Sequence, residues 1–185
     1  MQVAYQLPFE PDAYLAWEAS QTEKHEYWNG EVYAMGGARR EHVVVSGNVF
    51  AALKQRLRGK PCQPYIADMK LRVDEYNAFF YPDVMVSCNP DDRKADHFLS
   101  HPSVIIEVLS ESTAAYDRGD KFMAYRTLKS LQEYLIVEVD SRRVECYRRA
   151  TNQEWLLHDY FAGDSCQFHS LGFDIPLAEF FEELD

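Results

Sequence analysis

The chain has 185 residues and a mass of 21.5 kDa, a size that indicates a single domain spanning residues 1–185. Hydrophobic residues make up 46% of the chain, which excludes global disorder, and no apolar run approaches the roughly 20 residues of a membrane span. We therefore expect a cytoplasmic protein without a membrane anchor. The net charge of −11 argues against a protein that coats nucleic acid, but it is compatible with an enzyme that touches DNA locally or an acidic cleft that holds divalent cations.

Four cysteines are spread over the chain, at positions 62, 88, 146 and 166. No pair has the short separation, roughly two to four residues, that is typical of zinc sites. A chain of this size also folds without disulfide support. We therefore predict that all four are reduced packing residues.

The first third of the chain predicts two helices and a hairpin between them. Residues 12–22 predict a short helix, and Asn29-Gly30 between aromatic and β-branched residues predicts a tight β-hairpin. Residues 39–58 predict a longer helix, because apolar residues recur there at intervals of three to four and Gly59 follows the last turn.

The middle of the chain reads as strands separated by loops. We expect strands at 69–73 and 78–87, a charged loop at 89–100, and a strand at 103–109. The last of these is apolar on both faces, which is typical of a buried central strand.

The C-terminal part predicts a helix that Ser112 or Thr113 caps and that continues to about Lys129. The remaining predicted elements are a hairpin formed by residues 133–139 and 143–148, a strand at 155–160 and a short helix at 177–184. The sum is a mixed α/β (α+β) domain, with a sheet flanked by two principal helices.

Two acidic residues interrupt apolar strands. Glu107 stands inside the central strand, where an ionised carboxylate costs several kcal/mol unless a metal ion, a salt-bridge partner or the mouth of a cleft compensates it. Asp83 likewise stands between Tyr81-Pro82 and an apolar run, where a simple turn role is the alternative. Two such carboxylates on neighbouring strands can hold a hard divalent cation and leave positions for water and a phosphate.

The helix after Glu107 carries a third feature. Asp117, Lys121 and Tyr125 lie at intervals of four residues and so form one stripe along the helix. The alternative interpretation is an ordinary surface ion pair between Asp117 and Lys121.

In this order, the residues resemble the Uma-two family of bacterial proteins, which are classed as endonucleases of the PD-(D/E)XK restriction-endonuclease-like superfamily. The resemblance covers about residues 14 to 180. Its motifs are Gly30-Glu31, His42, Pro82-Asp83, Glu107-Val108-Leu109-Ser110, Ser112-Thr113, the stripe from Asp117 to Tyr125, and Glu133-Tyr134.

The resemblance implies a restriction-endonuclease-like fold, with a central mixed β-sheet flanked by α-helices. It makes Asp83 the first acid of the signature and Glu107 the second. The signature lysine, two residues after the second acid, is replaced here by Leu109. The resemblance implies that Lys121, on the following helix, takes its place.

The resemblance also implies a hydrolytic mechanism. Mg²⁺ or Mn²⁺ held by the two acids and the Val108 carbonyl would activate a water that attacks a DNA phosphodiester, with Lys121 stabilising the developing charge. Tyr125 and Asp117 would support this site, Glu31 would add a third acid, and His42 would approach the phosphate or water. For His42, a structural hydrogen bond is the alternative.

The implied partner is DNA, and analogy with nucleases that make double-strand cuts implies a homodimer. Basic residues that could contact phosphates form short clusters: Arg39-Arg40, Lys54 with Arg56, Arg58 and Lys60, Arg142-Arg143, and Arg148-Arg149. Two other functions stay open. One is a catalytically inactive nuclease fold that binds DNA or a protein partner, and the other is a metal-dependent hydrolase of another phosphate-containing substrate.

Overall fold

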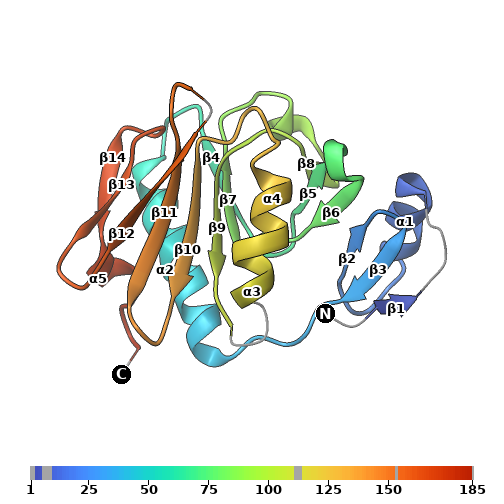
Figure 1. The fold of residues 1–185 in the computed structure, drawn as a ribbon, viewed down its shortest axis with the longest axis horizontal. Coiled ribbons are helices and arrows are strands. Elements are labelled where there is room, and N and C mark those ends of the chain that lie inside the picture. Colours follow the sequence, from blue (N-terminus) through green and yellow to red (C-terminus); the bar gives the residue numbers. More distant parts are fainter. Residues whose placement is uncertain (1–2, 6–9, 111–113, 153, 185) are drawn as a thin grey trace.

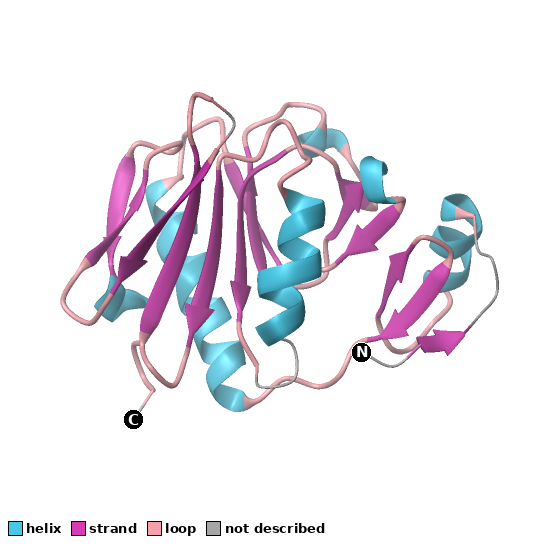
Figure 2. Ribbon diagram, viewed as in Figure 1, coloured by secondary structure: helices cyan, strands magenta, loops and turns pink. Residues whose placement is uncertain are grey.

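The computed structural model describes residues 3–5, 10–110, 114–152 and 154–184, and shows two six-stranded sheets and a small hairpin packed with helices (Figure 1). Helices cover both faces of the central sheet, which has the longer strands (Figure 2). The predicted mixed sheet flanked by α-helices is therefore confirmed.

The central sheet holds the strand that carries Glu107. Its strand order is β12 (Trp155–Tyr160), β11 (Arg143–Arg149), β10 (Glu133–Glu138), β9 (Pro102–Val108), β7 (Val84–Ser87) and β4 (Gln63–Ile66). β9 and β10 are parallel and the other pairs are antiparallel. The sheet is therefore mixed, and the predicted central strand and C-terminal hairpin are confirmed within one or two residues.

The second sheet lies beside the central one. Its strand order is β1 (Val3–Tyr5), β3 (Glu31–Ala34), β2 (His25–Trp28), β6 (Ala78–Phe80), β5 (Lys70–Val73) and β8 (Phe98–Leu99). The hairpin predicted at Asn29-Gly30 joins β2 and β3, and both turn residues have positive φ, 48° and 93°. An Asn-Gly turn adopts this left-handed backbone at low cost.

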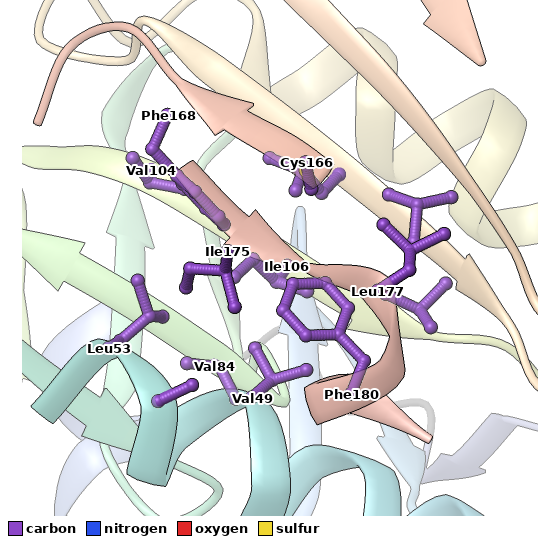
Figure 3. Close-up of a cluster of buried hydrophobic side chains, with 14 of the residues drawn as sticks. Val49, Leu53, Val84, Val104, Ile106, Cys166, Phe168, Ile175, Leu177 and Phe180 are labelled. Atoms are coloured by element: carbon purple, nitrogen blue, oxygen red, sulfur yellow. The ribbon is translucent and has the colours of Figure 1, made fainter. Parts of the chain in front are cut away.

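The long helix α2 (Arg40–Arg56) packs on one face of the central sheet, close to the predicted range 39–58. Its side chains Val49 and Leu53 meet Val104 and Ile106 of β9, as Figure 3 shows. The hairpin of β13 (Ser165–Phe168) and β14 (Phe173–Pro176), followed by α5 (Leu177–Phe180), adds further side chains to this core.

The opposite face of the sheet is covered by a helix in three parts: α3 (Ala114–Tyr116), a π-helical turn (Asp117–Lys121) and α4 (Phe122–Tyr125). The predicted helix extended to Lys129, but the observed one ends at Tyr125. Gly119 lies in the π turn, which agrees with its poor helix propensity. The predicted cap at Ser112 or Thr113 lies outside the described residues.

The prediction of a single strand at 78–87 is wrong, because this segment forms two strands that belong to two different sheets. β6 ends at Phe80, Tyr81-Pro82-Asp83 crosses between the sheets, and β7 begins at Val84. Pro82 has no N–H to donate to a strand ladder, and this favours a break at that point. The crossing places Asp83 at the start of β7.

Smaller differences concern the ends of elements and short strands. The first helix, α1, covers Pro11–Glu18 instead of 12–22, and α5 is shorter than the predicted 177–184. The predicted loop at 89–100 contains a 3₁₀ turn (Asp92–Lys94) and β8, and a second 3₁₀ turn (Asp74–Tyr76) joins β5 to β6. The strands that were not predicted are β1, β4, β8, β13 and β14, all four residues long or shorter.

The prediction that all four cysteines are reduced is wrong for two of them. Cys62 and Cys88 form a disulfide, whereas Cys146 and Cys166 are free and buried, as predicted. The antiparallel pairing of β4 with β7 sets Gln63 opposite Ser87, so the two cysteines face each other one residue further on, with their Cα atoms 3.9 Å apart. The two cysteines are 26 residues apart in the sequence, and this spacing does not predict that they are in contact.

Candidate active site

The two acids predicted from the sequence lie on the same face of the central sheet. Along β9, Val104 and Ile106 point to the α2 core, whereas Ile105 and Glu107 point to the other face, because side chains alternate along a strand. The backbone N–H of Asp83 donates to Oε2 of Glu107 over 3.2 Å. The sheet therefore brings together two carboxyl groups that are 24 residues apart in the sequence.

Lys121 reaches the same place from the π turn. Its Nζ lies 3.1 Å from Oε1 of Glu107 and 3.4 Å from Oδ1 of Asp117. The hydroxyl of Tyr125 donates to the same Glu107 oxygen over 2.8 Å. The stripe predicted on this helix thus faces Glu107, and the alternative of a surface ion pair is wrong because Lys121 is only 6% exposed.

A further carboxylate, which the sequence analysis missed, completes the surroundings of the lysine. Oε1 of Glu26 on β2 lies 3.1 Å from Nζ of Lys121, and Glu26 is only 3% exposed. Glu26 interrupts the aromatic run His25-Glu26-Tyr27-Trp28 just as Glu107 interrupts an apolar run, and this was the available signal.

Glu31, which was predicted as the third acid, is not part of this cluster. Strand alternation and the pairing of Glu26 with Tyr33 place Glu31 on the same sheet face as Glu26, but at the turn end of β3. Its carboxylate accepts a hydrogen bond from Tyr33, and among the described residues it has no contact with Lys121 or Glu107.

Burial and charge shape the protonation of the cluster. Burial raises the pKa of Glu107 to about 8; the Lys121 charge acts in the opposite direction, and the neighbouring acids raise the pKa further. Burial alone would lower the pKa of Lys121, but Glu107 and Glu26 raise it well above its ordinary value. The lysine is therefore held as a cation among carboxyl groups.

His42 lies on the more open side of Asp83, near the start of α2. Its Nε2 is 3.1 Å from Oδ2 of Asp83, and the same oxygen accepts the backbone N–H of Val108 over 2.8 Å. Burial lowers the pKa of His42, but the hydrogen bond to Asp83 and the Asp83 charge raise it more, so that it ends above its ordinary value. Nδ1 of His42 is buried and has no hydrogen-bond partner among the described residues.

A groove of about 480 Å³ opens beside His42. His42 connects the groove to the buried cluster, because it lines the groove and also contacts Asp83; Asp83, Glu107 and Lys121 themselves do not line it. Its walls carry residues of both charges: Arg39, Glu41, His42, Leu109, Ser110, Ala114, Arg118, Glu138, Val139, Asp140 and Ser141.

Four arginines of the predicted basic clusters pair with other parts of the chain. Arg56 pairs with Glu179, and Arg143 pairs with Asp159. Arg148 binds the buried Glu133. Arg149 donates to three backbone carbonyls at positions 126, 128 and 131. These four guanidinium groups have protein partners. Arg39 lines the groove.

The donor set fits Mg²⁺ better than a metal that needs a closed protein cage. In the described residues, no group of three or more His, Cys, Asp or Glu side chains is arranged to hold a metal ion. Mg²⁺ usually retains several waters and uses one or two carboxylates together with substrate phosphates. Asp83, whose side chain is 22% exposed, and the nearby Glu107 offer carboxylate oxygens of this kind.

Comparison with solved structures identifies the class of fold. The chain is similar to a crystal structure described as a putative nuclease belonging to DUF820 from Anabaena variabilis ATCC 29413. The TM-score is 0.76 at 16% sequence identity, and the match covers 94% of this chain and 98% of that one. The protein therefore has a nuclease-like fold, of the restriction-endonuclease-like kind that the sequence predicted.

The sequence comparisons identify the family. Residues 11–178 match the model of the Uma2 family, described as "Putative restriction endonuclease", and the chain belongs to this family. Two relatives from Synechocystis sp. (strain ATCC 27184 / PCC 6803 / Kazusa) are the uncharacterized proteins slr1290 and sll1609. The first is 40% identical over 162 residues, which is 88% of this chain and 85% of the relative. The second is 36% identical over 147 residues, which is 78% and 82% respectively.

The family resemblance noted from the sequence is thus confirmed. None of the helices in the described ranges is long and apolar enough to span a bilayer.

Proposed function

We propose that this protein is a metal-dependent endonuclease that hydrolyses phosphodiester bonds in DNA. The observation that carries the proposal is the convergence of Asp83, Glu107 and Lys121, which come from two strands and a helix, beside a groove. The membership of the Uma2 family and the nuclease-like fold support the same conclusion.

Asp83 and Glu107, with the Val108 carbonyl, would hold Mg²⁺ or Mn²⁺ in this proposal. When bound, the ion would supply a Lewis acid that polarises the phosphate and lowers the pKa of a water. Asp83 is prepared for this role by two contacts that orient its Oδ2, the Val108 N–H and His42 Nε2. Such support fixes a ligand in one orientation.

Lys121 would contribute a fixed positive charge. Nζ lies 3.1 Å from Glu107, so an ammonium stands next to the place where negative charge grows on the phosphate. Tyr125 donates to Glu107 and holds its carboxyl group in one position, and Asp117 holds the ammonium from the preceding turn of the helix. In this proposal, Lys121 would take the place of the lysine that is absent at Leu109.

His42 would stand where substrate enters. Its ring joins Asp83 to the groove. Nε2 donates to the Asp83 carboxylate, so Nδ1 is the ring nitrogen that would hold or accept a proton. Arg39, at the groove, would contact a phosphate of the DNA backbone.

Nicking of supercoiled plasmid with Mg²⁺ tests the proposal. Asp83→Asn should abolish both nicking and the rise in melting temperature that Mg²⁺ causes. Lys121→Met should keep the Mg²⁺ effect but slow nicking about 100-fold or more, since it removes only the charge-stabilising group. Asp74→Asn, which changes an exposed carboxylate on a turn, is the matched control and should behave as wild type.

Two results would reject the proposal. Nicking that survives both Asp83→Asn and Lys121→Met would mean that these residues do not form the active site. A folded wild type that neither nicks DNA nor responds to Mg²⁺ would favour the non-catalytic binding module.

The homodimer and the cytoplasmic location remain predictions.

A further inference from the structure

Glu26 contacts both halves of the site through one oxygen, whereas Glu107 reaches them with its two different oxygens. Its Oε1 accepts the backbone N–H of Tyr81 over 3.2 Å and lies 3.1 Å from Nζ of Lys121. Tyr81 begins the segment that crosses to Asp83, and Lys121 belongs to the helix on the other side. A single oxygen therefore ties the segment of the first acid to the lysine.

The position of Tyr81 explains why its amide needs this partner. β2 pairs with β6 through Tyr27 and Phe79, and the pairing stops where the chain leaves this sheet. Beyond Phe80, the Tyr81 N–H would be buried without a strand partner, which is costly. Pro82 has no N–H, so the Tyr81 amide is the last donor before Asp83. The Glu26 carboxylate thus fixes the chain two residues before the first acid.

The three acids around Lys121 hold it in different ways. Asp117 is four residues earlier on the same helical segment and moves with it. Glu107 belongs to the central sheet and is itself a proposed metal ligand. Glu26 comes from the second sheet and has no other task in the proposed chemistry. It is therefore suited to hold the ammonium at a fixed distance from the metal ligands.

We propose that Glu26 is a positioning residue that sets Lys121 and the Tyr81–Asp83 segment in their relative places. The proposal rests on the proposed nuclease function for its kinetic consequence.

Glu18 provides a matched control in the same chain. It is also buried, and it accepts a hydrogen bond from the hydroxyl of the same tyrosine, Tyr81, over 2.8 Å. Its other contacts are the backbone N–H and ring of His25, and within the described residues it makes no hydrogen bond or ion pair with Lys121. A general loss of packing around Tyr81 should therefore affect Glu18 and Glu26 variants alike.

The first experiment compares Glu26→Gln with Glu18→Gln in steady-state plasmid nicking with Mg²⁺. Glutamine keeps an oxygen for the Tyr81 amide but removes the charge that faces Lys121. Glu26→Gln should lower kcat at least about tenfold while KM for plasmid stays within about twofold, the pattern of an interaction that acts mainly in the transition state. Glu18→Gln should change neither constant by more than about twofold.

The second experiment does not need activity. Urea unfolding of Glu26→Gln, Lys121→Met and the double variant gives a double-mutant cycle. If Glu26 holds Lys121, the double variant should have a midpoint no lower than that of the less stable single variant, because the second change removes a contact that is already lost.

The results separate the two proposals. Equal loss of kcat in Glu26→Gln and Glu18→Gln, or midpoint shifts that simply add in the cycle, would overturn the positioning role. If the wild type nicks no plasmid, the proposed function fails, and the cycle alone then decides whether Glu26 positions Lys121.

Discussion

Replacing Glu107 with glutamine should change how the stability of the protein depends on pH. Two effects oppose each other at this carboxyl group: burial disfavours its charge, while Lys121 at 3.1 Å and Tyr125 at 2.8 Å favour it. Burial dominates and raises the pKa of Glu107 from 4.5 to about 8. Glutamine has nearly the same shape and does not titrate, so the comparison isolates this group.

The sign follows from proton binding in the two states. Between pH 4.5 and about 8, the unfolded chain has released the Glu107 proton and the folded chain retains it, so raising the pH favours unfolding. The contribution is fully present below pH 4.5 and is lost as the pH rises through about 8. At about 1.4 kcal/mol per pKa unit, the loss approaches about 5 kcal/mol over this window. Lys121 stays charged throughout, because its own pKa is raised well above 10.5.

The assay is urea unfolding of wild type and Glu107→Gln from pH 5 to 9, with a chelator present to remove divalent ions. The free energy of unfolding of wild type, relative to that of the variant, should fall by about 1.4 kcal/mol per pH unit and level off above pH 8. A difference that stays flat from pH 5 to 8 would refute the reasoning, because it would mean that Lys121 and Tyr125 outweigh burial.

Three further predictions concern the disulfide, the buried Glu133 and the oligomeric state. Reduction of the Cys62–Cys88 disulfide should lower the free energy of unfolding by about 3 kcal/mol. A thiol reductant should leave the stability of Cys62→Ser unchanged. If it destabilised wild type and Cys62→Ser equally, the disulfide would not be responsible. Glu133→Ala should cost about 3–5 kcal/mol in urea unfolding, because it leaves the guanidinium of Arg148 without its buried partner; a cost below about 1 kcal/mol would contradict this. Light scattering should give twice the 21.5 kDa chain mass if the predicted homodimer forms, and the single-chain mass would reject it.

The sequence was most informative where a local pattern is sufficient. The Asn29-Gly30 turn, the apolar spacing of α2 and the two-sided apolar strand β9 each depend on neighbours within about twenty residues. The anomaly of Glu107 was visible for the same reason, since a carboxylate inside an apolar strand requires compensation wherever the strand lies. Short elements such as β13 and β14 were missed because four residues carry too little pattern.

The partners of these residues could only be found in the folded chain. Glu26 and Glu31 have the same chemistry and share a sheet face, but Glu31 lies at the turn end of β3, and the docked helix brings Lys121 to Glu26. The disulfide likewise depends on the pairing of β4 with β7. The sequence by itself thus determined which groups needed compensation and which segments form the long helix and the central strand. The tertiary structure decided which groups meet, because strand register and helix docking join positions whose separation along the chain carries no information about contact.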